Sequence, residues 1–325
     1  MTQERIALVL GATGGIGGEV AWRLRERGWS VRALHRDAAR MAGRAQAGIS
    51  WMQGDAMRRD DVVAAARRVS LIVHAVNPPG YRNWGELVLP MLENTIAAAR
   101  ASGARILLPG TVYNYGPDAF ANIDEASPQH PVTRKGAIRA EMERRLHVAA
   151  ETGVKTLIVR AGDFFGPKAG NNWFSQGLIK PGHPVSSVSY PGRRNVGHHW
   201  AYLPDVGEIM VRLAEREDLE PFATFNMKGH WDADGTQMIA AIRRVVGQPG
   251  LKVRAFAWWL LAVASPFVPL FRELREMRYL WDVPVRMNNA RLVTVLGSEP
   301  HTPIDDAVRV TLQGLGCLAE PERHV

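Results

Sequence analysis

The stretch Arg5–Val20, RIALVLGATGGIGGEV, determines the fold. Its apolar segment Ile6–Leu10 runs directly into glycines and then into a helical pattern, which predicts a strand, a tight turn and a helix. Gly11, Gly14 and Gly17 follow the spacing G-x-x-G-x-x-G. Such glycines let the chain turn sharply, let the backbone approach a pyrophosphate and let the helix pack close to the strand. The stretch therefore predicts a dinucleotide site at the helix N-terminus, where N–H groups and the helix dipole favour phosphate.

Composition limits the class of protein. The chain has 325 residues, is 46% hydrophobic and carries a formal net charge of +8. This hydrophobic content supports a buried core and excludes wholesale disorder. The arginines are spread through the expected helices, which suits an anionic cofactor or substrate and does not indicate nucleic acid. A single cysteine, Cys317, and a first strand with no signal peptide before it lead us to expect no disulfide and a reducing, cytoplasmic setting.

The first half of the sequence alternates between strand and helix patterns. Further strands are expected at Ser30–His35, Ile49–Gln53, Leu71–Val76, Arg105–Leu108 and Thr156–Arg160, and helices at Gly15–Arg27, Asp60–Arg68, Trp84–Ser102 and Arg134–Thr152. Near-continuous apolar strands between amphipathic helices are typical of a parallel sheet covered on both faces. With right-handed crossovers, the predicted fold class is α/β, a doubly wound parallel Rossmann sheet.

This rhythm changes after Gly166-Pro167. Residues 168–197 are rich in loops and proline, a helix at Leu203–Arg212 and a late strand at Phe222–Met227 follow, and the pattern is mostly helical from about residue 228. We expect a Rossmann domain over residues 1–167 that is re-entered at about 198–227. Residues 168–197 and 228–325 would form a smaller, mostly helical substrate-binding region.

The most apolar run is Ala255–Phe271, AFAWWLLAVASPFVPLF. Its paired tryptophans could indicate a helix on a membrane surface. The run is shorter than a spanning helix requires, and Pro266 and Pro269 interrupt it, so no membrane span is expected. A buried or domain-capping helix is the favoured interpretation, and a dimer contact is the intermediate alternative.

Taken in order, these pieces resemble the short-chain dehydrogenase/reductase superfamily, in its extended and atypical branches, over roughly the first 230 residues. Besides GATGGIG, the motifs are Gly54-Asp55-Ala56, HAV at His74–Val76, TVYNYG at Thr111–Gly116, RAGDFFGP at Arg160–Pro167 and HHWAYLPDV at His198–Val206. Each motif is weak alone, but their order makes the resemblance specific. It implies a nicotinamide cofactor lying across the carboxyl ends of the strands.

The resemblance also implies which residues bind that cofactor. Asp55 would bind the adenine edge, Ala75 and Val76 would line the cofactor, and Asp163 would lie near the nicotinamide unless it only caps its own turn. The full set it implies is Gly11, Thr13, Gly14, Gly15, Ile16, Gly17, His35, Arg36, Asp55, Ala56, Ala75, Val76, Lys135, Ala161 and Asp163.

The residues that follow the second strand predict NADP, with NAD as the less favoured cofactor. An acid at this place binds the ribose hydroxyls of NAD, whereas an arginine accommodates a 2′-phosphate. His35 and Arg36 come before any acid, and Arg32 is nearby. A guanidinium holds phosphate through two parallel charge-assisted bonds. In the alternative, Arg36 is solvated and Asp37 makes the ribose contact.

The family's catalytic motif, Y-x-x-x-K, is missing. Counting back from Glu143, which matches a glutamate that often follows the family's lysine, places Lys135 at the tyrosine position and Arg139 at the lysine position. No tyrosine lies between Gly116 and Tyr190. The pattern K-x-x-x-R-x-x-M-E is instead similar to the isoflavone-reductase-like atypical branch, in which a lysine takes the active-site position beside NADPH.

Three residues are the candidates for catalysis: Lys135, Thr111 and Tyr113. Like charge from Arg134 and Arg139, together with burial, would lower the pKa of Lys135 towards acid–base duty. Alternatively, Lys135 stays charged and holds the nicotinamide ribose and a substrate oxygen, or it is a solvated lysine on a basic helix. Thr111 stands at the family's serine/threonine position, and Tyr113 could replace the missing proton donor.

The substrate side is less determined. Tyr115 is expected in a pocket wall, and His198 and His199 either face the substrate cleft or pack against the neighbouring tryptophan. Four aromatic residues favour an apolar or aromatic substrate but could equally be core: Trp173, Phe174, Trp200 and Trp231. No H-x-x-H, C-x-x-C or clustered carboxylate pattern predicts a metal.

The resulting hypothesis is an NADP-dependent oxidoreductase of the extended or atypical type that transfers hydride to or from a small organic substrate. A nucleotide-sugar epimerase or dehydratase is the enzymatic alternative, although the absent tyrosine normally assists its first oxidation. A non-catalytic NAD(P)-binding regulator is the alternative from another class. A homodimer is expected only because relatives are commonly dimers.

Overall fold

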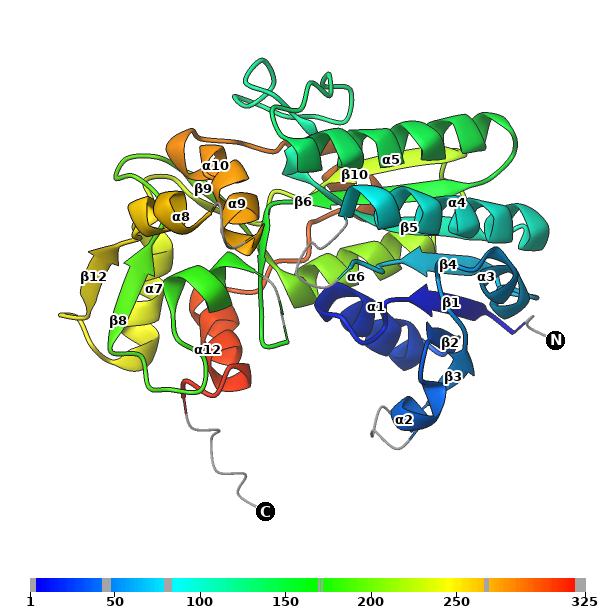
Figure 1. The fold of residues 1–325 in the computed structure, drawn as a ribbon, viewed down its shortest axis with the longest axis horizontal. Helices are drawn as coiled ribbons and strands as arrows, with labels where there is room; N and C mark the ends of the chain where they lie inside the picture. Colours follow the sequence, from blue (N-terminus) through cyan, green and yellow to red (C-terminus); the bar gives the residue numbers. More distant parts are fainter. Residues whose placement is uncertain are drawn as a thin grey trace.

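The computed structural model describes residues 4–42, 48–78, 84–168, 170, 172–265 and 269–318. Its main sheet has seven strands in the order β10-β6-β5-β4-β1-β2-β3. Their bounds are β1 Ile6–Leu10, β2 Ser30–His35, β3 Ile49–Gln53, β4 Leu71–His74, β5 Arg105–Thr111, β6 Thr156–Ala161 and β10 Phe222–Asn226. Every pairing in this sheet is parallel. The predicted doubly wound Rossmann sheet is therefore confirmed (Figure 1).

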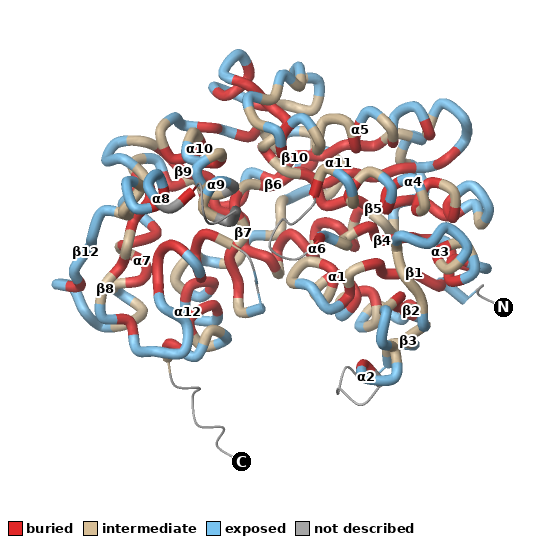
Figure 2. The backbone as a smooth tube through the Cα atoms, viewed as in Figure 1, coloured by how far each residue is buried: buried red, intermediate tan, exposed pale blue. Residues whose placement is uncertain are grey.

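Helices cover both faces of the sheet because successive strand residues point to opposite sides. Leu8 packs into a core with α3, α4 and α5, whereas the next residue, Val9, packs into a second core with α1 and α6. The helices span α1 Gly15–Glu26, α2 Ala38–Ala42, α3 Arg59–Ala65, α4 Trp84–Ser102, α5 Arg134–Glu151 and α6 Leu203–Ala214. Figure 2 shows the central strands as mainly buried.

Two strand ends differ from the prediction, each for a local reason. β4 ends at His74, two residues early, because Ala75 leaves the sheet to pass the glycine turn at Gly11. β5 continues to Thr111 because Pro109 and the residues after it still pair with β6.

The rest of the described chain packs beside the carboxyl ends of these strands (Figure 1). It contains two small sheets, with strand orders β11-β9-β7 and β12-β8. The strands span β7 Asp163–Phe165, β8 Ser187–Tyr190, β9 His198–Tyr202, β11 His230–Asp232 and β12 Lys252–Ala255. The helices span α7 Gln237–Val246, α8 Trp258–Ala264, α9 Pro269–Glu276, α10 Tyr279–Asp282, α11 Ala290–Leu296 and α12 Ile304–Gly314, with short turns η2 Val112–Asn114 and η3 Phe174–Leu178. After β9 the chain returns to the main sheet through α6 and β10.

Within the apolar run Ala255–Phe271, helix α8 is buried on one side only, so the expectation of a fully buried helix is wrong for α8, whereas the domain-capping alternative agrees with it. Trp258 and Leu261 of α8 pack inward, but Trp259 and Val263 are 67% and 68% exposed. One face of α8 therefore points away from the core. Within the described residues, every helix is too short or too polar to span a membrane.

A buried ion pair ties α5 to β6. The guanidinium of Arg160 lies 2.7 Å from Glu143, and both side chains are almost fully buried. Gln129 donates a further hydrogen bond to Glu143 at 2.7 Å, and Arg160 contacts Asn226 at 3.4 Å. Burial alone would lower the pKa of Arg160, but the charge and hydrogen bonds of Glu143 outweigh it and raise that pKa above its usual value. The pair fixes α5 relative to the end of β6.

Candidate cofactor and active site

The glycine turn is closed so tightly that side chains are excluded at two positions. Gly11 has a φ of +91°, and a Cβ on it would lie 2.5 Å from the carbonyl oxygen of Ala75. A Cβ on Gly17 would overlap the carbonyl oxygen of Gly11. This packing brings the start of α1 against the ends of β1 and β4, with Ala75 and Val76 beside the turn.

The N-terminus of α1 fits a phosphate group. Gly14 is the N-cap residue and makes no side-chain cap, so the backbone N–H groups of Gly15 and Ile16 begin the helix without that partner. Thr13 and Gly14 are exposed. An anion placed here would meet N–H groups and the positive end of the helix dipole.

The loop after β2 exposes both Arg36 and Asp37, and only Asp37 has its charged group engaged in a cap. The carboxylate of Asp37 accepts a hydrogen bond from the backbone N–H of Arg40 at 3.1 Å, which caps α2. Gln53 holds the loop by donating to the carbonyl of Arg36 and accepting from the N–H of Ala38. Arg36 and Arg40 are exposed, and His35 is half-buried with its Nδ1 accepting from the N–H of Asp37 at 3.0 Å.

Asp55 and Ala56 lie next to this loop, at the end of β3. Asp55 is half-buried, accepts from the N–H of Met57 at 3.0 Å and donates its own N–H to Asp61 at 2.9 Å. Asn94 donates to the carbonyl of Ala56 at 2.9 Å. Both residues lie along the same edge of the sheet as the glycine turn.

The three catalytic candidates converge at the carboxyl ends of β5 and β6. Thr111 pairs with Ala161 across the two strands, and its hydroxyl accepts the N–H of Tyr113 at 2.9 Å. A Cβ on Gly136 would overlap the carbonyl oxygen of Tyr113, so the first turn of α5 packs directly on the 112–114 turn. Lys135, immediately before Gly136, is buried with only 4% of its surface exposed. The solvated reading of Lys135 therefore does not apply.

A carboxylate from the C-terminal part of the chain completes the start of α5. Glu276, at the end of α9, accepts hydrogen bonds from the backbone N–H groups of Arg134 and Lys135, the latter at 3.2 Å. Thr133 caps the same turn by accepting from the N–H of Gly136 at 3.0 Å. Negative charge at a helix N-terminus is stabilising. Glu276 therefore docks the end of α9 beside Lys135.

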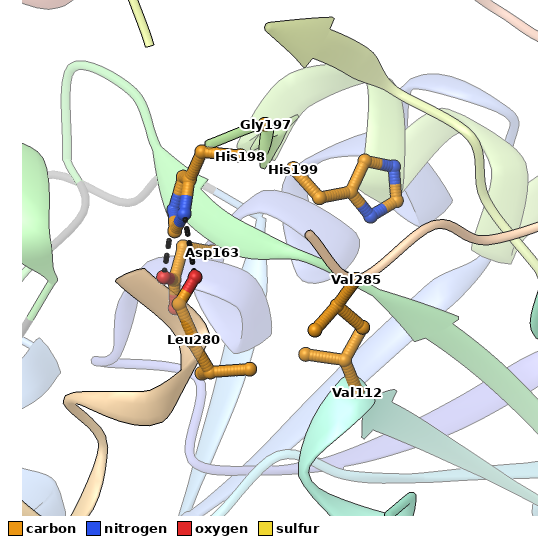
Figure 3. Close-up of a pocket in the computed structure, with 7 residues that line it drawn as sticks. All are labelled: Val112, Asp163, Gly197, His198, His199, Leu280 and Val285. Carbon is orange, nitrogen blue, oxygen red and sulfur yellow. Dashed lines mark hydrogen bonds and ion pairs between the residues drawn. The ribbon is translucent and has the colours of Figure 1, made fainter. Parts of the chain in front are cut away.

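Tyr113, Asp163 and His198 form a chain of contacts, of which Figure 3 shows the pair Asp163 and His198. The hydroxyl of Tyr113 lies 3.1 Å from one carboxylate oxygen of Asp163, and Nε2 of His198 lies 3.0 Å from the other. His198 stacks on Trp281 with ring centroids 3.7 Å apart and an interplanar angle of 7°. A cavity of about 10 Å³, lined by Asp163 and His198, adjoins the chain.

His198 lies between two oxygen atoms. Its Nδ1 lies 3.3 Å from the carbonyl oxygen of Leu280, which can only accept a hydrogen bond. Its Nε2 lies 3.0 Å from the carboxylate of Asp163. Asp163 and His198 are both at least nine-tenths buried, so their contact is shielded from bulk water.

Other sequence candidates on the substrate side belong to the core. Trp173, Phe174 and Trp200 are buried in the core cluster, so their core alternative applies. Tyr115 is fully buried beside Arg160, whose guanidinium lies 5.7 Å from its ring, so the expected pocket wall is wrong. Trp231 differs, because it is half-buried and lines a separate groove of about 590 Å³. Among the described residues, no group of His, Cys, Asp or Glu could hold a metal ion.

Three buried histidines are held neutral. Burial, reinforced by the charge of Arg139, lowers the pKa of His74 to about 3. Burial is also the main cause that lowers the pKa of His199 and of His230 to about 4 each, with a smaller contribution from His301 at His230. His199 faces the carbonyl oxygen of Lys228, so it is packed rather than open to a cleft.

These histidines predict that the protein loses stability in mild acid. Because each folded-state pKa lies below the ordinary 6.5, the stability they contribute is complete above pH 6.5 and is lost as the pH falls towards 4 and 3. The three histidines together should lower the free energy of unfolding by about 4 kcal/mol as the pH falls from about 7.5 to 5.5. Thermal or urea unfolding across this range measures the loss. His74→Gln should reduce the slope of the free energy of unfolding against pH by the equivalent of about one bound proton. An unchanged slope in that variant would contradict the lowered pKa of His74.

Comparison with known proteins identifies the family. A sequence model described as the NAD dependent epimerase/dehydratase family matches residues 7–227. The chain belongs to this family. Membership agrees with the suspected extended branch of the short-chain dehydrogenases/reductases and with a nicotinamide dinucleotide as cofactor.

Solved epimerases share the fold of this family member. UDP-glucose 4-epimerase from Thermus thermophilus, in complex with NAD, superposes with a TM-score of 0.71 at 19% identity, covering 95% of this chain and 98% of that one. UDP-glucuronic acid 4-epimerase from Bacillus cereus, in complex with UDP-glucuronic acid and NAD, has a TM-score of 0.71 at 13% identity with the same coverage.

A curated relative is named as a reductase and not as an epimerase. The 3-diazoavenalumate denitrifying reductase of a Streptomyces species is 31% identical over 183 residues, which are 50% of this chain and 57% of the relative. The chain thus aligns with little more than half the length of that reductase.

Two parts of the site were missed by sequence reasoning. Asp163 and His198 were each identified, but nothing in their separation along the chain links them. Glu276 was not identified, because a glutamate in a short helix with two arginines and two glutamates carries no signal for a contact with α5. Only the three-dimensional arrangement shows these pairs.

Proposed function

We propose that this protein is an NADP-dependent reductase of a small organic substrate. The observation that supports the proposal is the burial of Lys135, whose neighbour Gly136 packs on Tyr113, together with the contacts of Tyr113 and His198 to Asp163. Perturbed or shielded titratable groups that converge where a cofactor reacts are candidates for acid–base catalysis.

The residues that would hold the dinucleotide follow from the fit of the site. The glycine turn and α1 would bind the pyrophosphate, Asp55 and Ala56 the adenine, and Arg36 the 2′-phosphate. Ala75, Val76 and Ala161 would line the nicotinamide half. When bound, the reduced nicotinamide would supply a hydride to the substrate. Residues 168–197 and 228–325 would form the substrate side.

The protein's own residues would then move the proton. Lys135, as a cation, would hold the nicotinamide ribose and a substrate oxygen, and Thr111 would position that oxygen. Tyr113 would give its hydroxyl proton to the atom that gains negative charge during hydride transfer. The resulting phenolate would regain a proton from Asp163, and Asp163 from His198. One hydride and one proton thus reach the substrate together.

A reductase is favoured over an epimerase for two reasons. The family tyrosine, which assists the initial oxidation in nucleotide-sugar epimerases, is absent from α5. In addition, the curated relative is named as a reductase.

The direct experiment is an assay of NADPH consumption with aldehydes, ketones and 3-diazoavenalumate. The proposal expects turnover with at least one aromatic member of the panel. Turnover of a UDP-sugar by the protein as purified, with retained NAD and no added cofactor, would contradict it. Tight NADPH binding with no turnover of any substrate would instead identify a regulator.

The choice of NADP has its own prediction. Arg36→Ala should weaken NADPH binding by about ten- to hundredfold and leave NADH binding nearly unchanged, because a charge-assisted bond to the 2′-phosphate is lost. Calorimetric titration with both nucleotides measures this. Asp37→Asn is the matched variant, and it should change neither affinity much, since Asp37 caps α2. Equal affinities of the unmodified protein for NADH and NADPH would refute the proposed preference.

A further inference from the structure

An apolar patch lies on the outer face of α8. It consists of Trp259, Leu260 and Val263, which are 67%, 48% and 68% exposed. These positions are separated by one, three and four residues, so the three side chains share one face of the helix. The opposite face carries Trp258 and Leu261, which pack towards the core. The patch is therefore presented outward by a helix that is anchored from behind.

The surroundings of this α8 patch are basic. From residue 252 to residue 278 the sequence has five basic residues and two acidic ones. The basic side chains are all exposed: Lys252, Arg254, Arg272, Arg275 and Arg278. Of the two acids, Glu276 is turned inward to cap α5. The α8 patch thus lies among more basic than acidic residues of this segment, although Arg278 also pairs with Asp282 at 3.3 Å.

Packing of the neighbouring elements places these charges around the patch. β12 leads directly into α8, and its four residues are all exposed (Figure 2). Arg275 of α9 donates to Ser265, at the end of α8, at 2.7 Å. Arg278 lies over the ring of Trp258 at 5.5 Å. The cations therefore flank α8 on both sides.

A second copy of the chain is a poor match for this surface. A standard protein interface buries about 800 Å² per partner, which three side chains on a short helix do not supply. Two basic surfaces would also repel each other. An exposed tryptophan with aliphatic neighbours and a ring of cations is instead the composition of helices that lie in a lipid interface.

We propose that the α8 patch docks the protein reversibly on anionic lipid bilayers. Trp259, Leu260 and Val263 enter the headgroup region, and the surrounding arginines and Lys252 contact the anionic headgroups. The proposal goes beyond the proposed reductase activity and does not depend on it.

Vesicle binding tests the proposal with the full chain. Sedimentation with vesicles of phosphatidylcholine plus phosphatidylglycerol is compared with vesicles of phosphatidylcholine alone. We expect binding to the anionic vesicles that weakens as salt is raised. The triple variant W259S/L260S/V263S should bind them at least about tenfold more weakly. Trp22→Ser is the matched control, because Trp22 is 50% exposed beside arginines on α1, and it should bind like the unmodified chain.

The melting temperature and NADPH binding of each variant serve as controls that it is folded. If the triple variant does not fold, the single variant Val263→Asp, which adds a negative charge at an exposed position, should weaken vesicle binding in the same way. Three results would overturn the proposal. The first is that the unmodified protein does not bind anionic vesicles. The second is that the patch variants bind them as tightly as the unmodified protein. The third is that the protein binds no vesicles and forms a dimer in solution, which the patch variants dissociate.

Discussion

Replacing Glu143 with alanine is expected to lower the free energy of unfolding by about 3–5 kcal/mol. The variant leaves the guanidinium of Arg160 buried without its carboxylate, and an uncompensated buried charge is strongly destabilising. Gln129 also loses an acceptor at 2.7 Å. Because this pair holds α5 against β6, the loss should reduce the order of the Lys135 region as well as overall stability.

Urea unfolding of the two proteins measures this difference. Glu141→Ala on the same helix is the control, since Glu141 pairs with Arg144 and Arg145 near the surface and should contribute only about 0–1 kcal/mol. Glu143→Gln should fall between the two, because it keeps hydrogen bonding and loses the charge. If Glu143→Ala cost no more than Glu141→Ala, the buried pair would not be a main stabilising contact.

Replacing Tyr113 with phenylalanine is expected to lower kcat by about a hundredfold to ten-thousandfold, the usual contribution of a positioned proton donor. The side chain loses only the hydroxyl that lies 3.1 Å from Asp163. NADPH binding should be nearly unchanged, because no part of the dinucleotide site is removed. Steady-state kinetics with the best substrate of the panel, together with nucleotide titration, separates the two effects.

Tyr279→Phe is the matched control. Tyr279 is a second phenol in the field of Asp163, and burial together with that carboxylate raises its pKa above the usual value. Its hydroxyl makes no hydrogen bond to another described residue, so kcat should change by no more than about twofold. Asp163→Asn should resemble Tyr113→Phe and should also shift the pH profile of kcat. Full activity in Tyr113→Phe would assign the proton to another group.

The main sheet could be predicted from sequence because its signals are local. Apolar strands, the glycine turn at Gly11 and the long helix Trp84–Ser102 are each encoded within a few residues, and these predictions are confirmed. The structure differs from the prediction where contacts with residues distant in the sequence determine the length of a strand or the burial of a side chain. β5 is lengthened by pairing with β6, and Tyr115 is buried by Arg160, a residue far away in the sequence. α8 looked like core because composition does not show which face is covered.

The candidate site was predictable only in part, because some of its contacts also join residues that are distant in the sequence. The motif order placed the residues proposed to bind the dinucleotide along one edge of the sheet, since the carboxyl ends of parallel strands meet there. The burial of Lys135 depends on the contact of Gly136 with Tyr113 and on the cap from Glu276. The contact between Asp163 and His198 depends on β7 lying beside β9.

The most direct test of the account compares Lys135→Met with the unmodified protein in two readouts, NADPH affinity and turnover. Methionine keeps the length and buried apolar volume of the lysine stem and removes its charge. The account predicts an NADPH affinity within about tenfold of the unmodified protein and a turnover at least about a hundredfold lower. Unchanged turnover in Lys135→Met, measured on a substrate that the unmodified protein reduces with NADPH, would contradict the claim that this lysine serves in place of the family's tyrosine.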